Sequence, residues 1–300
     1  MDCITRLKAP DCETQRAMIY KLKKRYPFLN CSCCARSLCS RGIFTLSIGK
    51  SCNPVLLAGG FHAQEWLTSL LLLRFTEELC RCAVTRGELC GIDVTGALRS
   101  REVIIIPCVN PDGVQIALHG APAAGRYSQD YERIVAASTD KWNANARGVD
   151  INHNFDAGWS ILREMEIDQG ILAPSPRRYG GYMPESEPET KALADLCRLR
   201  KPRKAIAFHS QGEEIYYSYG NNTPQRSLRE GRILAAASGY TLVENEGLAS
   251  HGGFKDWFIE YFARPAFTVE IGRGENPLPL EDFEDIYRKA LPMMVLSIIM

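Results

Sequence analysis

The sequence lacks several features that would assign it to a class of protein at once. It has no apolar run approaching the ~18 residues of a membrane-spanning helix. No basic segment followed by an apolar stretch marks a secretion signal at its N-terminus. Neither sign of charge is in excess, since 36 Lys and Arg oppose 35 Asp and Glu, which argues against nucleic-acid binding. We therefore expect a cytoplasmic protein with no membrane or nucleic-acid partner.

Histidine is also scarce, with five residues in 300, whereas there are 12 cysteines. This cysteine content is far below that of a disulfide-stapled scaffold. Four cysteines gather at Cys31, Cys33, Cys34 and Cys39, and Cys31 with Cys34 forms a Cys-x-x-Cys pair. A structural metal site or a redox pair is one interpretation. Free thiols on an early hairpin are favoured, because no second spaced pair follows.

The chain shows no division into separate parts. No internal repeat, low-complexity tract or Gly/Ser-rich linker interrupts it, which predicts one domain over residues 1–300 with a helical N-terminal extension at 1–25. Apolar segments typical of buried strands occur at 43–48, 54–58, 103–107, 204–208 and 266–269. Helical patterns occur at 13–26, 67–82, 188–199 and 280–299. This alternation predicts an α/β fold with helices on both sheet faces and a ligand site at the carboxyl ends of the strands.

Metal-binding residue types follow three of these predicted strands. His62 and Glu65 come after the strand at 54–58, His209 after that at 204–208, and Glu270 after that at 266–269. The three-residue spacing of His62 and Glu65 lets both side chains converge on one point. With His209 they make the His, Glu, His set of a catalytic zinc site, which leaves one position open for water. Glu270 is the candidate base that takes a proton from that water.

A single His-x-x-Glu pair is a weak signal, because a histidine after a strand most often only completes a hydrogen-bonded structure. Four such residues, found at the carboxyl ends of predicted strands, are a much stronger signal. A silent binding protein on the same scaffold is a competing hypothesis, but such a chain would be expected to have lost a ligand or the base. We therefore expect an enzyme with one Zn²⁺ per chain.

With these residues in place, the chain resembles the zinc carboxypeptidases related to carboxypeptidase A. The family pattern of an HxxE pair, a distant His and a Glu base near the C-terminus corresponds to His62, Glu65, His209 and Glu270. Further family landmarks match in order at 110–113, 148–155 and 252–257. The resemblance implies a zinc metallopeptidase built as a three-layer α/β/α sandwich around a mixed, mainly parallel sheet.

The same resemblance locates departures from ordinary family members. The family Arg that grips the terminal carboxylate of the substrate is His153 here, beside Asn152 in the substrate-binding segment, and a second family Arg is Gln64. The Arg that assists the oxyanion falls on Asn143, with Arg147 nearby as a substitute. Because His makes at most one contact where Arg makes a bidentate fork, the sequence predicts a changed specificity around a retained metal and base.

Several stretches are similar to the bacterial γ-D-glutamyl–diaminopimelate peptidases of this family, which cleave the γ-D-Glu to meso-diaminopimelate bond of murein peptides. These stretches lie at 152–156, 208–217 and 252–258. Lys255 falls where the family sets side-chain preference and is predicted to pair with the extra carboxylate of the substrate, unless it points to solvent. Glu214 or Glu213 is predicted to pair with the amine, and the mobile Tyr of the digestive enzymes falls on Leu248.

The sequence thus predicts a zinc-dependent peptidase that hydrolyses the γ-D-glutamyl–meso-diaminopimelate bond, with a murein-derived peptide as its partner. The alternative is a metallocarboxypeptidase that releases acidic C-terminal residues. Lys255 fits both hypotheses, whereas the loss of the family Arg at His153 disfavours the second.

Overall fold

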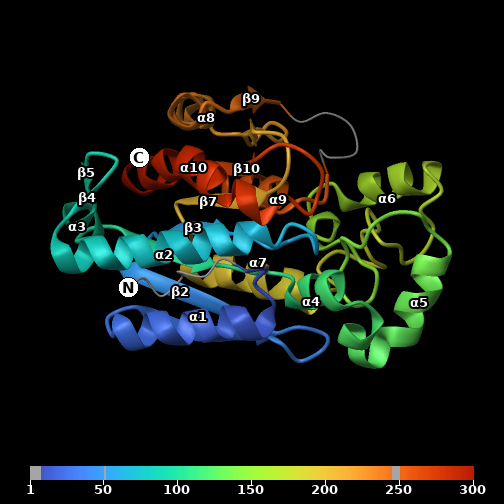
Figure 1. The fold of residues 1–300 in the computed structure, drawn as a ribbon. Coiled ribbons are helices and arrows are strands. Elements are labelled where there is room, and N and C mark those ends of the chain that lie inside the picture. The colour runs from blue at the N-terminus through green and yellow to red at the C-terminus, as the bar shows by residue number, and fades with distance from the viewer. Residues whose placement is uncertain (1–7, 51, 245–250) are drawn as a thin grey trace.

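The computed structural model describes residues 8–50, 52–244 and 251–300, so Leu248 lies outside the described residues. Its centre is an eight-stranded sheet in the order β1-β2-β6-β3-β7-β10-β8-β9, and β4 and β5 form a separate ribbon (Figure 1). The strands are β1 (Asn30–Arg36), β2 (Gly42–Gly49), β3 (Val55–Ala58), β4 (Glu88–Leu89), β5 (Ile92–Asp93), β6 (Glu102–Ile106), β7 (Lys204–His209), β8 (Glu214–Tyr216), β9 (Thr241–Val243) and β10 (Ala266–Glu270). The inner strands β6, β3, β7 and β10 run parallel, while β2 joins β6 and β8 joins β10 antiparallel. The predicted mixed, mainly parallel sheet is confirmed.

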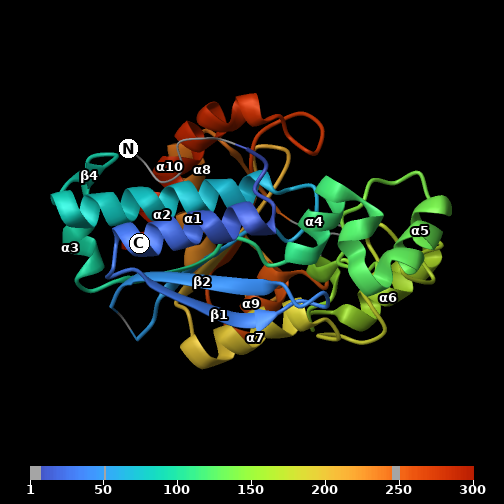
Figure 2. The same cartoon turned by 60° about the horizontal axis from the view of Figure 1, so that its bottom comes forward.

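Helices cover both faces of this sheet. They are α1 (Cys12–Arg25), α2 (Leu67–Thr85), α3 (Val94–Leu98), α4 (Pro111–His119), α5 (Ser128–Ala136), α6 (Trp159–Asp168), α7 (Pro188–Arg200), α8 (Gln225–Ser238), α9 (Phe254–Phe262) and α10 (Phe283–Ile299), with short 3₁₀ helices at Ala121–Tyr127, Ile151–His153 and Leu280–Asp282. Helices α1, α2, α10 and α8 lie side by side on one face (Figure 1). Helices α7 and α9 pack on the other, and Figure 2 shows β1 and β2 between α1 and α7. The predicted three-layer α/β/α sandwich is therefore present.

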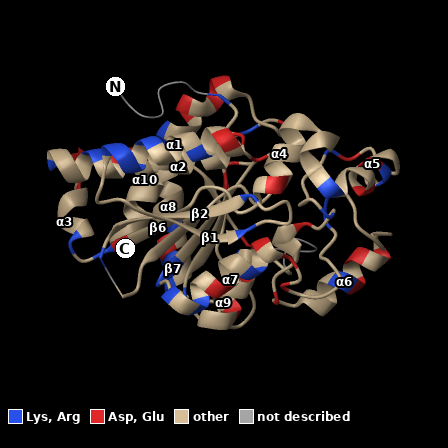
Figure 3. Cartoon of the chain, turned by 90° about the horizontal axis from the view of Figure 1, so that it is seen from below, with Lys and Arg blue, Asp and Glu red and all other residues tan. Residues whose placement is uncertain are grey.

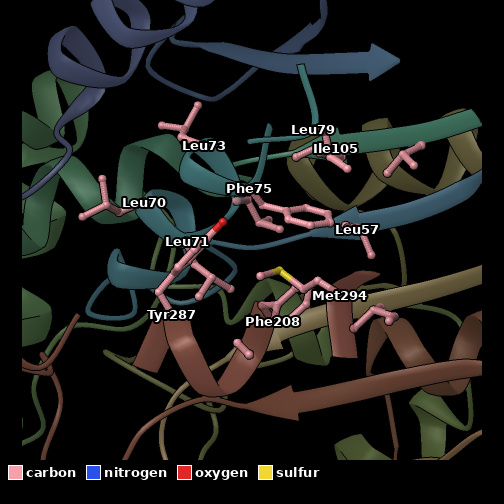
Figure 4. Close-up of a cluster of buried hydrophobic side chains, with 14 of the residues drawn as sticks. Leu57, Leu70, Leu71, Leu73, Phe75, Leu79, Ile105, Phe208, Tyr287 and Met294 are labelled. Carbon is pink, nitrogen blue, oxygen red and sulfur yellow. The ribbon is translucent and has the colours of Figure 1, made fainter. Parts of the chain in front are cut away.

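Two buried clusters hold the layers together, one on each face of the sheet. Successive residues of a strand point to opposite faces, so Leu57 joins the cluster beneath α2 and α10 while Leu56 joins the one beneath α7 and α9. Figure 4 shows Leu57 and Phe208 of the sheet packed with Phe75 of α2 and Met294 of α10. Each fully buried side chain of this size contributes about 1.5–3 kcal/mol. Burial on both faces explains why the inner strands read as unbroken apolar runs.

Helix α1 begins where the sequence supplies a cap. The Asp11 side chain accepts a hydrogen bond from the backbone N–H of Thr14 at 2.8 Å, and basic residues occupy the last turn, where they complement the helix dipole. Its apolar side contributes Met18, Ile19 and Leu22 to the core beneath α2. The N-terminal helix is thus packed into the main body of the protein.

The strands β1 and β2 form the predicted early antiparallel hairpin. Cys31, Cys33, Cys34 and Cys39 are free thiols in it, as expected. Figure 3 shows that acidic and basic residues are both spread over the helices, while the strands carry few charged residues. Among the helices that the structure describes, none is both long enough and apolar enough to cross a membrane.

A buried carboxyl group at the start of α7 provides a pH-sensitive element. Glu187 and Glu189 are fully buried, as is Asp112. Glu187 accepts hydrogen bonds from Asn145 and Arg147, whereas the bonds that Glu189 accepts from Asn145 and from the backbone of Leu38 are both long, at 3.4 Å. Burial, together with the charges of Asp112 and Glu187, raises the pKa of Glu189 to about 8.

Replacing Glu189 by Gln is expected to flatten the pH dependence of stability. Folded Glu189 keeps its proton up to about pH 8, whereas the unfolded chain releases it near the ordinary value of 4.5. Unfolding between these values releases a proton, so the free energy of unfolding falls as pH rises, by at most about 1.4 kcal/mol per pH unit. Urea unfolding from pH 5 to 8 measures this slope, with the exposed Glu132→Gln as the control. Parallel curves for wild type and Glu189→Gln would contradict the assignment.

Candidate metal centre and active-site cavity

The first two metal-ligand candidates lie on a sharp turn between β3 and α2. Gly60 follows the strand with a φ of +61°, and a Cβ atom there would lie 2.8 Å from the Ser69 hydroxyl and 3.0 Å from the Cα of Cys108. Only glycine fits this close approach without strain. The next turn is closed by a hydrogen bond from the backbone N–H of Glu65 to the carbonyl of His62. Both side chains are thereby directed to the carboxyl edge of the sheet.

The three ligand candidates converge on one point. The Nδ1 atoms of His62 and His209 lie 3.2 Å apart, and the Glu65 carboxylate lies 2.8 Å from the first and 3.0 Å from the second. On the far side of its ring, His62 Nε2 lies 3.1 Å from the Asp150 carboxylate. Among the described residues, this is the group of His, Cys, Asp and Glu side chains whose ligand atoms are close enough to share a metal ion.

This arrangement fits zinc. The Asp150 carboxylate accepts the Nε2–H of His62, which leaves the Nδ1 lone pair facing Glu65 and His209. A carboxylate that orients a ligating histidine in this way is a common partner of zinc sites. Two imidazole nitrogens and a carboxylate that meet in this way can hold a metal ion in place of the protons they otherwise share, and three protein ligands leave a position open for catalysis.

The electrostatics of these residues follow from their burial and mutual proximity. Burial opposes the charge of His62, but the carboxylates of Glu65 and Asp150 outweigh it and hold the pKa of His62 well above its ordinary value, so a metal ion that binds Nδ1 displaces a proton from it. Burial likewise favours neutral Glu65, but the two histidines lower its pKa to about 2. Burial dominates for His209 and lowers its pKa, so His209 stays neutral, the form that binds a metal.

Glu270 reaches the same point from β10. The sheet register places it beside His209 on the parallel strand β7 and beside Glu214 on the antiparallel strand β8. Burial is the main cause that raises the pKa of Glu270 well above its ordinary value, and the charges of Glu65 and Glu214 add to it. A carboxyl group whose pKa is raised toward the working pH is suited to accept and return a proton.

These residues open onto a cavity of about 870 Å³ at the carboxyl ends of β7 and β10. Its wall is made of polar side chains of both charge signs. Of the predicted residues it includes His62, Glu65, Glu270, Gln64, Asn143, His153 and Glu214. The structure thus brings two of the three metal-ligand candidates, the candidate base and several substrate-binding candidates onto one cavity wall, with His209 beside them.

Three predicted substrate or catalytic residues are engaged inside the protein instead. Arg147 pairs with buried Glu187 at 2.8 Å. Lys255 is 2% exposed, pairs with Asp256 and donates to the Ser218 carbonyl at 2.6 Å. The side chain of Asn152 accepts a hydrogen bond from the backbone N–H of Phe254. None of the three is among the residues that line the cavity.

Sequence reasoning did not assign a role to several residues of the cavity wall, among them Asp150, Arg177 and Arg178. Tyr216 lines it and donates a hydrogen bond to Glu214 at 2.6 Å. Arg177 and Arg178 line it from the connection between α6 and α7. Two adjacent arginines in a loop without hydrophobic periodicity were the available signal, since loops on a rigid scaffold often carry binding residues.

Comparison with known proteins agrees with this geometry. The model of the zinc carboxypeptidase family matches residues 16–292. The chain is 34% identical to γ-D-glutamyl-L-diamino acid endopeptidase 1 of Lysinibacillus sphaericus, over 91% of this chain and 68% of that protein.

Two solved structures share the fold. Bovine thrombin-activatable fibrinolysis inhibitor, in complex with tick carboxypeptidase inhibitor, aligns with a TM-score of 0.73 at 20% identity, covering 97% of this chain and 96% of that one. Murein-tripeptide amidase MpaA from Escherichia coli O157 aligns with a TM-score of 0.55 at 22% identity, covering 89% and 91%. With this family match over most of its length and a His, Glu, His group that can hold a metal, the chain belongs to the zinc carboxypeptidase family and is a zinc metallopeptidase.

Proposed function

We propose that this protein hydrolyses the amide bond between γ-D-glutamate and meso-diaminopimelate in murein-derived peptides, with one zinc ion per chain. The observation that carries the proposal is the cavity wall, in which carboxylates and cationic side chains surround the ligand set. Such a wall fits a substrate that bears carboxylates and a free amine near the cleaved bond. The name of the Lysinibacillus sphaericus relative points to the same class of bond.

In this proposal His62, Glu65 and His209 hold the zinc ion. When bound, zinc supplies Lewis-acid chemistry, which polarises an amide carbonyl and lowers the pKa of water. Glu270 takes the proton from the attacking water and returns it to the leaving nitrogen. Of the two candidate oxyanion donors, Asn143 is favoured, because it lines the cavity while the guanidinium of Arg147 is held by Glu187. The Asn143 side-chain amide would donate to the carbonyl oxygen as its charge develops.

Glu214 is proposed to receive the free amine of diaminopimelate. Its carboxylate lies on the cavity wall beside Glu270, where Tyr216 fixes it by a hydrogen bond. Gln64 also lines the wall and is available as a neutral hydrogen-bonding group for the peptide. Asn152 is proposed to support substrate binding indirectly, because its side chain accepts a hydrogen bond from the backbone N–H of Phe254.

Both candidates assign a role to Lys255: in the first it pairs with the extra carboxylate of diaminopimelate, and in the second, release of acidic C-terminal residues, it anchors an acidic side chain. That ammonium group is buried against Asp256 and Ser218. Drawing it toward a substrate would leave Asp256 buried without its cation, at substantial cost. The two candidates are therefore separated by the following assay.

The zinc-loaded protein is expected to release diaminopimelate from L-Ala-γ-D-Glu-meso-diaminopimelate, and a chelator should stop the release. An α-linked peptide with a C-terminal glutamate, assayed in parallel, should stay intact. Protein carrying Glu270→Gln, purified identically, controls for contaminating peptidases. Cleavage of only the α-linked peptide would overturn the proposal in favour of the second candidate, and no cleavage of either would overturn both.

A further inference from the structure

We propose that Arg177 and Arg178 form a guanidinium clamp that binds a carboxylate of the diaminopimelate residue of the substrate, replacing the arginines that this chain lacks at His153 and Gln64. The inference rests on the proposed function and names the residues that give it specificity. Three observations support it. The loop that bears both arginines is held by backbone hydrogen bonds, His153 binds this loop rather than a substrate, and neither guanidinium group forms an ion pair with a described residue.

The loop is held by its backbone, which leaves its side chains available. The carbonyl of Pro176 accepts hydrogen bonds from the backbone N–H groups of Asn143 and Ala144, at 2.8 and 2.9 Å. The carbonyl of Tyr179 accepts one from Asp150 at 2.8 Å. The two arginines are thus fixed at both flanks, alongside the segment that carries Asn143 and Asp150. A clamp on a fixed loop loses less conformational entropy on binding than one on a mobile loop.

Arg178 is anchored to the metal centre through Asp150. Its backbone N–H donates to one oxygen of Asp150 at 3.0 Å, while the other oxygen of that carboxylate faces Nε2 of His62. Its φ of +70° is a costly conformation for a residue with a side chain, and the surrounding hydrogen bonds sustain it. The position of Arg178 relative to the catalytic site is therefore defined through one intervening side chain.

His153 supports this loop. Its Nδ1 atom lies 2.9 Å from the carbonyl of Arg178 and 3.0 Å from the carboxylate of Glu166, so Nδ1–H is shared between these two acceptors. The Glu166 carboxylate also accepts the backbone N–H of Gly180 at 3.1 Å. His153 stands where the family has its carboxylate-binding Arg. Here its imidazole holds the backbone of this loop in place, and in our proposal Arg177 and Arg178 supply the guanidinium groups that bind the carboxylate.

Within the described part of the chain, neither guanidinium group has a carboxylate partner, and Arg178 is exposed while Arg177 is half-buried. The Nε–H of Arg177 is buried without an acceptor among the described residues. The nearby Arg147 and Arg163, in contrast, are neutralised by the buried carboxylates of Glu187 and Glu166. A buried, unsatisfied guanidinium donor on a cavity wall calls for an acceptor from outside the chain. A carboxylate matches its forked geometry.

Diaminopimelate offers two such carboxylates, one beside the cleaved bond and one at the far end of its side chain. Two altered tripeptides separate them. In L-Ala-γ-D-Glu-L-Lys the far carboxylate is missing, and in a tripeptide carrying the carboxamide beside the cleaved bond the near one is neutral. The wild type should prefer the diaminopimelate tripeptide over at least one of the two, by roughly 10- to 100-fold in KM, the range of a hydrogen-bonded charge.

The clamp is tested with Arg177→Gln, Arg178→Gln and the double variant, and the exposed Arg133→Gln of α5 is the matched control. The double variant should lose this preference through a higher KM for the diaminopimelate tripeptide, with an unchanged kcat and unchanged cleavage of the disfavoured peptide. Arg→Lys variants should recover part of it, since they restore charge without the fork. Calorimetry of free meso-diaminopimelate binding gives a second readout that does not require turnover.

The two proposals fail differently. If the wild type does not cleave the diaminopimelate tripeptide, the proposed function is wrong, and the calorimetric comparison still tests the clamp. If the wild type cleaves it but shows no preference over either altered peptide, or if the double variant keeps the preference and the affinity for diaminopimelate, the clamp is wrong while the proposed function stands.

Discussion

Replacing Glu270 by Gln is expected to lower kcat by roughly 10²- to 10⁴-fold, the range of general acid–base catalysis, without loss of zinc. Gln has almost the same shape but does not accept a proton from water or return one to a leaving nitrogen. Glu270 also lies against the ligand set and has a raised pKa that burial and nearby carboxylates impose. Removal of this carboxyl group should relieve that repulsion, so thermal stability should hold or rise.

Glu214→Gln is the matched control, because the same change is made on the neighbouring strand of the same cavity. It should raise KM for a substrate with a free amine while leaving kcat within a few fold. Steady-state kinetics and zinc analysis on both variants provide the measurement. Equal losses of kcat in both, or a zinc-free Glu270→Gln protein, would show that Glu270 is not the base.

Replacing His209 by Ala is expected to abolish stoichiometric zinc binding and, with it, turnover. The ligand set would fall to His62 and Glu65, which is too few for a tight site. Because zinc stabilises the folded state that binds it, added zinc should raise the melting temperature of the chelator-treated wild type and leave that of His209→Ala unchanged. The melting temperature thus reports on the site without any substrate.

Asp150→Asn provides a graded comparison. It keeps the shape of the residue that orients His62 but removes its charge, which should weaken zinc binding by about 10- to 100-fold rather than abolish it. Zinc affinities from competition with a chelator should therefore rank wild type, Asp150→Asn and His209→Ala in that order. Stoichiometric zinc in His209→Ala would contradict the assigned ligand set.

The sequence predicts those parts of the molecule that depend on neighbouring residues or on a strong pattern of apolar residues. The inner strands are buried on both faces, so their apolar runs identify them, and the residues that end these strands meet at one edge because the strands are parallel. That reasoning located His62, Glu65, His209 and Glu270 together. The shorter helices α5 and α6, of nine and ten residues, were not predicted.

Side-chain partners from distant parts of the chain could not be predicted in this way. The guanidinium of Arg147 is held by Glu187, which lies forty residues later in the chain, and no pattern in the sequence around Arg147 predicts this partner. Lys255 directly precedes its counter-ion, Asp256, in the sequence. However, only the burial of α9 against the sheet, which the sequence does not show, keeps this ion pair inside the protein and Lys255 away from the cavity. Arg177 and Arg178 reach the cavity through the path of a loop, and loop paths leave no periodic trace in a sequence.

The pairing of β10 with β7 and β8 has a consequence for how this protein tolerates insertions and deletions. Glu270 stands beside His209 and Glu214 only while β10 keeps its register with both neighbours. Since side chains alternate between faces, one residue gained or lost within Ala266–Glu270 would turn the carboxyl group to the opposite layer of the sandwich. Length changes in the connections that shape the cavity have no such effect on the strands. The loops are therefore free to diversify substrate preference, while the strand lengths must stay constant for the chemistry to persist.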